Sequence, residues 1–330
     1  MRTSKMKAAY SNGYGSPAVL EIRQIDIPKV KENEVLIRVH AASATTADGM
    51  MRTGKPYFSR LFTGIRRPKN PIPGTGFAGE VIKTGTKVTE FETGDQVFGE
   101  TTLGFSSNAE YLAIPETGVI LPKPENLSYV EAATFCDGHL TSMNFLKEIA
   151  NIQPGQKVLI NGASGSLGTA AVQLARYFEA EVTAVTSTRN IGLVKALGAD
   201  HVIDYTREDF TKSYERYDII YDTIGKSSFT ASKKVLSENG QYISPVLKPS
   251  ILFHMLITSM FGTKKAKFAA SGLKSDMELK TLLSEVIEIY QQGRLKTIID
   301  RQFPLDKIRQ AHAFIASGHK KGNVVINISF

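Results

Sequence analysis

The chain has 330 residues, of which 42% are hydrophobic and 22% charged; its formal net charge is +8, and it has one cysteine, Cys136. The length favours two domains, and the composition is that of a globular protein rather than a disordered or fibrous one. A single cysteine excludes an internal disulfide framework and a cysteine-rich zinc site, and it is compatible with the reducing cytoplasm, where we expect the protein.

The positive charge is scattered along the chain. Its densest clusters, residues 66–69 and 264–267, are short and contain no interleaved aromatic residues, which favours a solvated surface over a nucleic-acid partner. The first residues lack the apolar core of a secretory signal. The longest apolar stretch, Ile251 to Phe261, falls short of the roughly 20 residues that span a bilayer. We therefore expect no membrane span, and this stretch is a short helix near a pocket mouth or a weak surface anchor.

The first 125 residues are rich in predicted strands. Val35–Val39 and Gly79–Lys83 are short β-type runs, and Gly- and Pro-containing turns separate such runs. This spacing predicts a partly closed β domain. A helical stretch then begins after Ser128, a candidate N-cap that has Glu131 three residues on, and a second helix ends near Ala150.

From Lys157 onward, strands and helices alternate. Apolar, β-branched strands that alternate with helices predict a parallel, doubly wound sheet of the α/β class. A further amphipathic helix covers Asp276 to Gln291, and the chain ends in a strand, Asn323–Ile328. We predict a β-rich domain over residues 1–125, completed by residues 290–330, and an inserted cofactor domain over residues 126–289. The predicted strands of the inserted domain are Lys157–Ile160, Val182–Val185, Val202–Asp204, Asp218–Asp222 and Gly240–Ser244, and its first two helices are Leu167–Phe178 and Ile191–Leu197.

Glycine occupies every third position of the turn that follows the first of these strands. Glycine lets the backbone turn tightly and approach a diphosphate, and the N-terminus of the next helix offers N–H groups and a positive dipole end. The G-x-x-G-x-x-G spacing departs from G-x-G-x-x-G, but its place at the first strand–helix junction predicts a dinucleotide site. The expected binding residues are Gly162, Ser164, Gly165, Ser166, Leu167 and Gly168.

The end of the second strand indicates which dinucleotide binds. An NAD enzyme needs an acid about 20 residues past the turn, whereas residues 186–190 contain hydroxyls and a guanidinium and no carboxylate. Glu181 lies at the wrong end of the strand. Ser187 and Arg189 suit a 2′-phosphate, which favours NADPH, although Arg189 can also be read as a solvated residue at a helix start.

Several short runs resemble the medium-chain dehydrogenase/reductase superfamily, and in particular its zinc-independent quinone oxidoreductase-like branch. The resemblance covers essentially the whole chain and implies a GroES-like β domain beside a Rossmann domain. The runs that carry it are residues 73–81, 94–99, 109–111, 153–168 and 197–205.

The resemblance also indicates that catalytic zinc is absent. Where zinc members have a Gly-His-Glu run, this chain has Gly74-Thr75-Gly76; the cysteine-ligand position is Thr45, and the third ligand position falls near Asp137. One possible oxygen ligand does not hold a catalytic zinc ion, and the six histidines are dispersed. We therefore expect no metal site.

Further site residues follow only from the resemblance. It places Thr141 beside the nicotinamide and Tyr205 near the adenine and the 2′-phosphate, although Thr141 can be a helix-interior residue and Tyr205 can be at the edge of the core. Thr45 departs from the family's asparagine, which weakens its expected catalytic role. The nearby Asp48 matches an acidic position of the family but fits a structural role equally well. Tyr57, a candidate catalytic residue, and Phe62 lie in a loop that could line a substrate cleft. The remaining expected cofactor-binding residues are Thr223 and Gly225, Ser244 and Pro245, and Gly322 and Asn323.

Without zinc, nothing obvious polarises an alcohol. The expected activity is therefore NADPH-dependent transfer of hydride to a small electrophilic acceptor, a quinone or an α,β-unsaturated carbonyl. Two alternatives stay open at this point: a cofactor-binding protein with a structural or regulatory role, and an NADP alcohol dehydrogenase. Base rates and the resemblance both favour a homodimer.

Overall fold

The computed structural model describes residues 5–57 and 60–328, and it divides the chain into two compact units. The first unit comprises residues 1–137, 272–284 and 299–330, and the second comprises residues 138–271 and 285–298. These limits differ from the expected domain boundaries at residues 125/126 and 289/290. The described chain contains no helix with the length and hydrophobicity needed to cross a bilayer.

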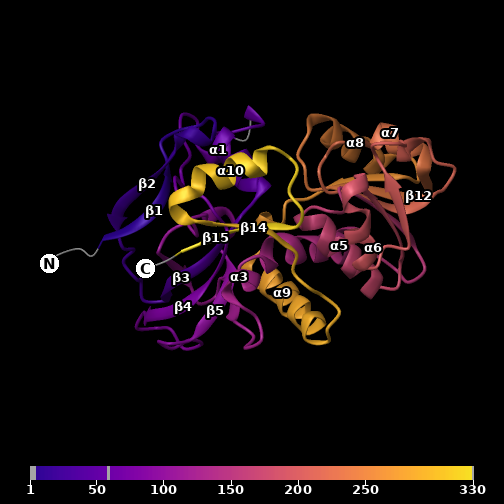
Figure 1. Cartoon of the computed structure of the whole chain (residues 1–330). Coiled ribbons are helices and arrows are strands. Elements are labelled where there is room, and N and C mark those ends of the chain that lie inside the picture. Colours follow the sequence, from indigo (N-terminus) through magenta and orange to yellow (C-terminus); the bar gives the residue numbers. More distant parts are fainter. Residues whose placement is uncertain (1–4, 58–59, 329–330) are drawn as a thin grey trace. The chain divides into compact units, whose positions relative to one another are not determined.

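The first unit is built mainly of strands (Figure 1). Its strands are β1 (Lys5–Ser11), β2 (Leu20–Asp26), β3 (Glu34–Ala44), β4 (Gly76–Thr84), β5 (Gln96–Glu100), β6 (Tyr111–Pro115), β7 (Val119–Pro122), β14 (Ile299–Pro304) and β15 (Asn323–Asn327). Its helices are α1 (Thr46–Thr53), α2 (Arg60–Thr63), α3 (Tyr129–Ala132) and α10 (Ile308–Ala316).

A mixed sheet organises this unit. Its order is β14-β15-β3-β4-β5-β7, with β6 paired to β3, while β1 and β2 form a separate antiparallel pair. Strand β15 pairs antiparallel with β3, so the C-terminal segment completes a sheet that begins near the N-terminus, as predicted. The long strand β3 is buried along most of its length, and its Ile37 and Val39 pack in one core with Phe77 and Leu112. The predicted GroES-like β domain is confirmed.

The second unit is a Rossmann-type α/β unit. Its strands are β8 (Lys157–Asn161), β9 (Glu181–Thr186), β10 (His201–Asp204), β11 (Tyr217–Asp222), β12 (Leu236–Ser244) and β13 (Lys265–Phe268). Its helices are α4 (Thr141–Met143), α5 (Ser166–Tyr177), α6 (Ile191–Ala196), α7 (Phe229–Ser232) and α8 (Pro249–Met260), while α9 (Asp276–Gln291) is divided between the two units.

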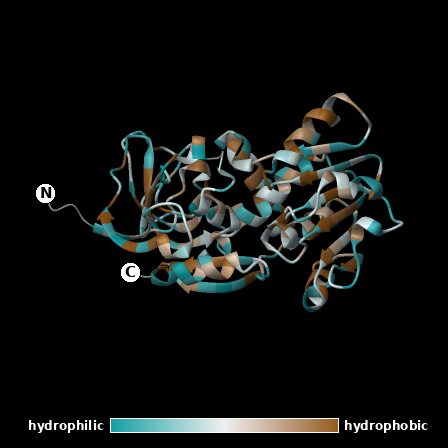
Figure 2. Ribbon diagram, turned by 90° about the horizontal axis from the view of Figure 1, so that it is seen from above, coloured by the Kyte–Doolittle hydropathy of each residue, from teal (hydrophilic) through white to brown (hydrophobic). Residues whose placement is uncertain are grey.

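The six strands pair in parallel in the order β10-β9-β8-β11-β12-β13, so the predicted doubly wound sheet is confirmed. The strands are rich in apolar residues (brown in Figure 2), and α5 packs against β8 and β9 while α6 packs against β9 and β10. The strand order reverses between β8 and β11. In open parallel sheets, a crevice for ligands lies at the carboxyl ends of the strands beside such a reversal. The glycine-rich turn follows β8 at this point.

Candidate active site

The glycine-rich turn connects β8 to α5, and two of its glycines are required by the fold. Gly162 has a φ of +82°, a conformation that side chains disfavour. At Gly168, an added Cβ would lie 2.2 Å from the carbonyl oxygen of Gly162. These two glycines therefore allow the close approach of helix α5 to strand β8, which brings the N-terminus of the helix to the end of the strand.

Gly165 differs from the other two glycines. It is the N-cap of the twelve-residue helix α5 and, as a glycine, it provides no side-chain cap to that helix. An added Cβ would meet only the carbonyl oxygen of Gly162, at 3.5 Å, which is an ordinary contact. The fold itself therefore tolerates a side chain here, and the space it would fill lies over the N-terminus of the helix. An uncapped helix N-terminus with open space above it fits a dinucleotide diphosphate.

Asn190 joins the glycine-rich turn to the end of β9. Its buried side-chain amide donates to the hydroxyl of Ser164 at 3.0 Å and to that of Ser187 at 3.3 Å. Arg189, next to it, is exposed. The backbone N–H of Tyr205 donates to the carbonyl of Thr186 at 3.0 Å, and its ring is 60% exposed. The structure thus brings Ser164, Ser187, Arg189 and Tyr205 to one edge of the sheet, and the sequence did not point to Asn190.

Asp204 is a second residue that sequence reasoning missed. It ends β10, beside the end of β9, and accepts hydrogen bonds from the Thr188 hydroxyl and from the Thr206 hydroxyl and N–H. These bonds hold the pKa of Asp204 below its usual value, and Arg207 lies 3.8 Å away. The sequence could have indicated Asp204, because it ends a predicted strand and the carboxyl ends of adjacent parallel strands meet at one edge of a sheet.

The ends of β11 and β12 lie beyond the reversal of strand order. Thr223 is nearly buried, and its hydroxyl donates to the carbonyl of Asn161 at 2.8 Å. The buried Ser244 hydroxyl donates to the carbonyl of Asp222 at 2.8 Å. Gly225 has a φ of +64°. The hydroxyls of Thr223 and Ser244 therefore link the ends of β8, β11 and β12. Because both hydroxyls bond to the protein itself, mainly backbone borders the crevice here. Pro245 follows Ser244 in the chain.

Buried Asp222 is the residue that holds these strand ends together. Its carboxylate accepts from the Asn161 amide at 2.9 Å, from the Ser227 N–H at 2.8 Å and from the Tyr242 hydroxyl at 2.7 Å. Burial and this neighbouring carboxylate raise the pKa of Tyr242 above its usual value. With three donors and no exposed surface, Asp222 positions the crevice and does not face a ligand.

Thr141 lies on a helical stretch that contacts the start of α5. A π-helical segment, Cys136–Leu140, precedes α4, and another, Asn144–Ile149, follows it. The hydroxyl of Ser142 donates to the carbonyl of Leu167 at 2.9 Å, which fixes this stretch against the first turn of α5. Thr141 is half-buried next to that contact. The structure therefore places Thr141 close to the glycine-rich turn of its own unit.

In the first unit, Thr45 has a structural task. It is the N-cap of α1, where its hydroxyl accepts from the Asp48 N–H at 3.1 Å and lies 3.0 Å from the Asp48 carboxylate. That carboxylate also accepts from the N–H groups of Thr45 and Gly74, at 2.7 and 2.8 Å. Burial raises the pKa of Asp48 to about 6 against these bonds. The hydroxyl of Thr45 is therefore committed to the helix cap, and Asp48 fastens α1 to the Gly74 turn.

Glu100, at the end of β5, is the second residue of this unit, after Asp48, whose carboxyl has a raised pKa. Burial, with the negative charges of Asp137 and Asp48, raises its pKa to about 8. Its carboxyl group is therefore mostly protonated at neutral pH. Sequence reasoning did not identify it, because nothing in the local pattern shows that Asp137, Asp48 and Asp276 lie within electrostatic reach of Glu100.

The other predicted residues of the first unit are spread apart. Tyr57 is 66% exposed and lies under two cations, the Arg60 guanidinium at 4.8 Å and the Lys55 ammonium at 5.8 Å from the ring centre. Gly322 has a φ of +61°, and Asn323 begins β15 and is buried. The side chain of Phe62 lies outside the described residues.

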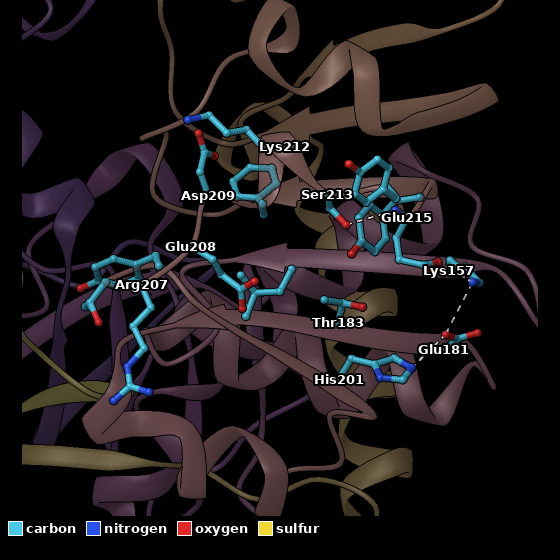
Figure 3. A pocket seen from close by; sticks show the side chains of 16 residues that line it. Lys157, Glu181, Thr183, His201, Arg207, Glu208, Asp209, Lys212, Ser213 and Glu215 are labelled. Atoms are coloured by element: carbon cyan, nitrogen blue, oxygen red, sulfur yellow. Dashed lines mark hydrogen bonds and ion pairs between the residues drawn. The ribbon is translucent and has the colours of Figure 1, made fainter.

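A polar groove of about 1090 Å³ lies on the β8–β10 face of the second unit (Figure 3). Only a short 3₁₀ turn, Phe210–Lys212, occupies the connection from β10 to β11, so no full helix covers this face. Polar groups at its rim pair with each other: Lys157 forms an ion pair with Glu215 at 2.9 Å, and the His201 ring is hydrogen-bonded to Glu181 at 3.1 Å. Because opposite charges pair there, nothing in this rim selects an anionic cofactor.

Comparison with known proteins identifies the family. Residues 31–125 match the alcohol dehydrogenase GroES-like domain, and residues 197–326 match a family described as zinc-binding dehydrogenase. The chain is 32% identical over 98% of its length to 2-methylene-furan-3-one reductase of Solanum lycopersicum, covering 79% of that protein. It is 30% identical over 97% of its length to the chloroplast envelope quinone oxidoreductase homolog of Arabidopsis thaliana, covering 98% of it. The chain belongs to the medium-chain dehydrogenase/reductase superfamily, in its quinone oxidoreductase-like branch.

A solved structure agrees with this membership. The quinone oxidoreductase from Coxiella burnetii superimposes with a TM-score of 0.87 at 28% identity, over 99% of this chain and all of that one. As a medium-chain dehydrogenase/reductase, the protein is an oxidoreductase with a nicotinamide cofactor. The glycine-rich turn, the uncapped start of α5 and the strand ends beside it fit that cofactor.

Zinc does not fit the residues present in this medium-chain dehydrogenase/reductase. Of the expected ligand positions, that of the histidine is occupied by Thr75 and that of the cysteine by Thr45, whose hydroxyl is bound to Asp48, which leaves one possible oxygen ligand near Asp137. Among the residues that the structure describes, no three His, Cys, Asp or Glu side chains form a group that could hold a metal ion. The family description names zinc, but this chain lacks the side chains that would bind it.

Proposed function

We propose that the protein is an NADPH-dependent reductase that transfers hydride, without zinc, to a quinone or an α,β-unsaturated carbonyl. One observation carries this proposal: the N-terminus of α5, with a glycine as its N-cap, lies beside Ser187 and Arg189, in a chain whose zinc-ligand positions offer one possible oxygen ligand, near Asp137. Two relatives support the acceptor class by their names, 2-methylene-furan-3-one reductase and, at 29% identity, the NADPH-dependent alkenal/one oxidoreductase of Arabidopsis thaliana.

The choice of NADPH over NADH rests on the end of β9. Ser187 and the exposed Arg189 offer a hydroxyl and a guanidinium to a 2′-phosphate. Asp204 is an acid that the structure adds at this edge of the sheet, and its oxygens accept from Thr188 and Thr206. Because those bonds turn the carboxylate toward its own loop, we propose that it repels a 2′-phosphate only weakly.

The residues divide the work as follows in this proposal. NADPH supplies a hydride when bound, and the acceptor takes one proton in addition, which turns a quinone into a hydroquinone or saturates an enone. Residues 162–168 hold the diphosphate; Ser187, Arg189 and Tyr205 hold the phosphorylated adenosine; Thr223, Gly225, Ser244 and Pro245 border the ribose. Thr141, Gly322 and Asn323 serve the nicotinamide end. The protein binds and orients the reactants and excludes water.

The three catalytic assignments differ in kind. We propose Thr141 as the hydroxyl beside the nicotinamide, since Ser142 fixes its helix against α5. For Thr45 we propose an indirect role through the helix cap, because its hydroxyl already serves Asp48. Tyr57 is proposed as an exposed aromatic at the acceptor side.

An acceptor panel assayed with both cofactors tests the activity. We expect oxidation of NADPH with 1,4-benzoquinone, 9,10-phenanthrenequinone or short enones, unaffected by chelators. No turnover by a protein that still binds NADPH would point to a structural or regulatory role instead. Alcohol oxidation that a chelator abolishes would point to an alcohol dehydrogenase.

A charge reversal at Arg189 tests the cofactor assignment. Arg189→Glu should weaken NADPH binding about 10- to 100-fold, the worth of one charge-assisted hydrogen bond of about 1.5–3 kcal/mol, and should affect NADH much less. Lys195→Glu, which reverses another exposed cation on the neighbouring helix α6, should leave both affinities unchanged. Equal losses for NADPH and NADH in Arg189→Glu would contradict the assignment.

We further propose a cytoplasmic homodimer. Two-fold dimers are the commonest soluble oligomers, and a chain with one cysteine, Cys136, has no internal disulfide that would need an oxidising compartment. Light scattering should give twice the chain mass of 36.2 kDa. Cell fractionation tests the location.

A further inference from the structure

Glu100 carries a carboxyl group to which the proposed mechanism gives no part. It ends β5, where its backbone pairs with that of Gly76 in β4, so positions 76 and 100 share one face of the sheet. On that face, an added Cβ at Gly76 would lie 2.5 Å from the carbonyl oxygen of Ala133, and the Cys136 thiol is within electrostatic reach of Glu100. Glu100 therefore lies between β4 and the segment that leads from Ala133 to Asp137.

This place is surrounded by the positions where zinc members of the family have their ligands. Thr75, at the histidine position, directly precedes the glycine that pairs with Glu100. Asp48, which is bonded to Thr45 at the cysteine position, and Asp137, near the third position, both act electrostatically on Glu100. A zinc ion polarises the oxygen of the substrate. Because zinc does not fit this chain, another group has to act on the oxygen of an acceptor bound here.

The charges around Glu100 keep its proton in place. Three carboxylates act on it, those of Asp137, of Asp48 in α1 and of Asp276 at the start of α9. The Lys320 ammonium, the cation on this side, acts on Asp137. Burial and the three negative charges raise the pKa of Glu100 to about 8. A carboxylic acid that its surroundings keep neutral at pH 7 can donate to an oxygen on which negative charge develops.

The carboxyl group of Glu100 is also free to act on a ligand. Among the residues that the structure describes, none is hydrogen-bonded or ion-paired to it. The carboxyl of Asp48, by contrast, accepts from the N–H groups of Thr45 and Gly74 and is committed to the fold. Glu100 is half-buried rather than fully enclosed, so an acceptor and water can reach it.

We propose that Glu100 is the proton donor of the reduction and gives its carboxyl proton to the carbonyl oxygen of the acceptor. This inference rests on the proposed transfer of hydride to a quinone or an enone. Once the acceptor has taken the hydride, the displaced electron pair gives that oxygen a negative charge. The O–H bond of Glu100 breaks and an O–H bond forms on the acceptor, which becomes a hydroquinone or an enol; the enol converts to the saturated ketone in water. The Glu100 carboxylate then regains a proton from water.

The pH dependence of kcat/KM tests the proposal. With NADPH and 3-penten-2-one, kcat/KM of the wild type should fall about tenfold per pH unit above about pH 8, where Glu100 is ionised. Glu100→Gln copies the shape of the neutral acid but has no proton to give. It should lower kcat/KM at least about 100-fold at pH 7, abolish the fall at high pH and leave NADPH affinity within about twofold. Glu92→Gln, at an exposed acid of the same unit, should change none of these quantities.

A second measurement needs no turnover. The infrared spectrum of the full chain should contain the C=O band of a protonated carboxylic acid that disappears as the pH rises through about 8, and Glu100→Gln should lack that band. Because glutamine is neutral, as the folded protein keeps Glu100, the unfolding midpoint of Glu100→Gln at pH 8 should be no lower than that of the wild type. Glu100→Asp, which keeps an acid on a shorter side chain, should restore a pH-dependent kcat/KM.

Two results would overturn the proposal and leave the proposed function standing. One is a folded Glu100→Gln protein with the kcat/KM and the pH profile of the wild type. The other is an infrared spectrum in which Glu100 is already ionised at pH 7. A wild-type protein that binds NADPH but reduces no acceptor would instead overturn the proposed function, and the proton donor with it.

Discussion

Gly165 offers the sharpest separation of cofactor binding from folding. Its added Cβ would meet only the Gly162 carbonyl oxygen at 3.5 Å, and its φ of −82° is open to alanine. Gly165→Ala should therefore fold, with a cost of about 0.5 kcal/mol for a poorer N-cap and a fall in Tm of about 1–3 °C. The new methyl group occupies the space over the helix N-terminus, where we place the diphosphate.

The expected loss in affinity follows from that geometry. A methyl group holds a diphosphate about 1 Å or more farther from the helix N–H groups, beyond hydrogen-bonding distance for one of them. The loss of one charge-assisted bond of about 1.5–3 kcal/mol weakens NADPH binding about 10- to 100-fold. The chain has no tryptophan, so titration calorimetry or the emission of NADPH itself is the suitable measurement.

The matched control is Gly13→Ala, where an added Cβ meets nothing within 4 Å. It should leave NADPH affinity and the turnover of the acceptor panel unchanged. If Gly165→Ala bound NADPH within about twofold of the wild type while folded, the diphosphate would not lie on this helix mouth, and the cofactor reasoning would be refuted.

Three further predictions concern stability. Gly168→Ala should cost about 1–3 kcal/mol of unfolding free energy in urea, because its Cβ would lie 2.2 Å from the backbone oxygen of Gly162; a cost no larger than that of Gly165→Ala would contradict this packing. The folded pKa of Asp48 is raised from 3.8 to about 6, so only the folded state holds its proton between these values. The free energy of unfolding of the wild type should then fall by up to about 3 kcal/mol, relative to that of Asp48→Asn, as the pH rises from 4 to 6. Parallel pH profiles for the two proteins would contradict the raised pKa of Asp48. The ring of His312 accepts from the Arg52 guanidinium at 3.3 Å, and burial lowers its pKa from 6.5 to about 3. Below pH 6.5 the unfolded state therefore takes up a proton that the folded state does not, and the free energy of unfolding should be about 2 kcal/mol lower at pH 5. His312→Gln, which keeps an acceptor for Arg52, should remove that loss in urea titrations at pH 5 and 7.

The sequence predicted the elements whose signals are local. The cap at Ser128 is an example: its hydroxyl accepts from the Glu131 N–H at 3.2 Å, as the S-x-x-E pattern predicts. The alternation of strands and helices gave the parallel sheet. The turn at Gly162 was likewise predicted from local spacing, because the chain cannot adopt that turn with other residues.

Features that depend on tertiary contacts were not predicted. Residues 264–267 were interpreted as a basic surface cluster, whereas Lys265–Phe268 form β13, the edge strand beside β12. Lysines are common on edge strands because they discourage further pairing, and pairing with β12 cannot be seen in so polar a run. The bridging amide of Asn190 and the commitment of Thr45 to Asp48 depend on neighbours that only the fold supplies.

The apolar run Ile251–Phe261 shows the limit most clearly. Its composition predicted a helix, and α8 confirms it. Composition could not show which side of that helix would be covered, because burial depends on what the rest of the chain packs against it.

The amide bridge from Asn190 to Ser164 and Ser187 has a consequence for recognition. Because the chain makes these bonds itself, the two loops are preorganised, and the cost of ordering them is met during folding. With NADPH as the proposed coenzyme, an isolated fragment such as 2′,5′-ADP should therefore meet a formed receptor and need no nicotinamide to assemble it. Discrimination by the 2′-phosphate can then take place at the first encounter, before the reactive end of the coenzyme is seated.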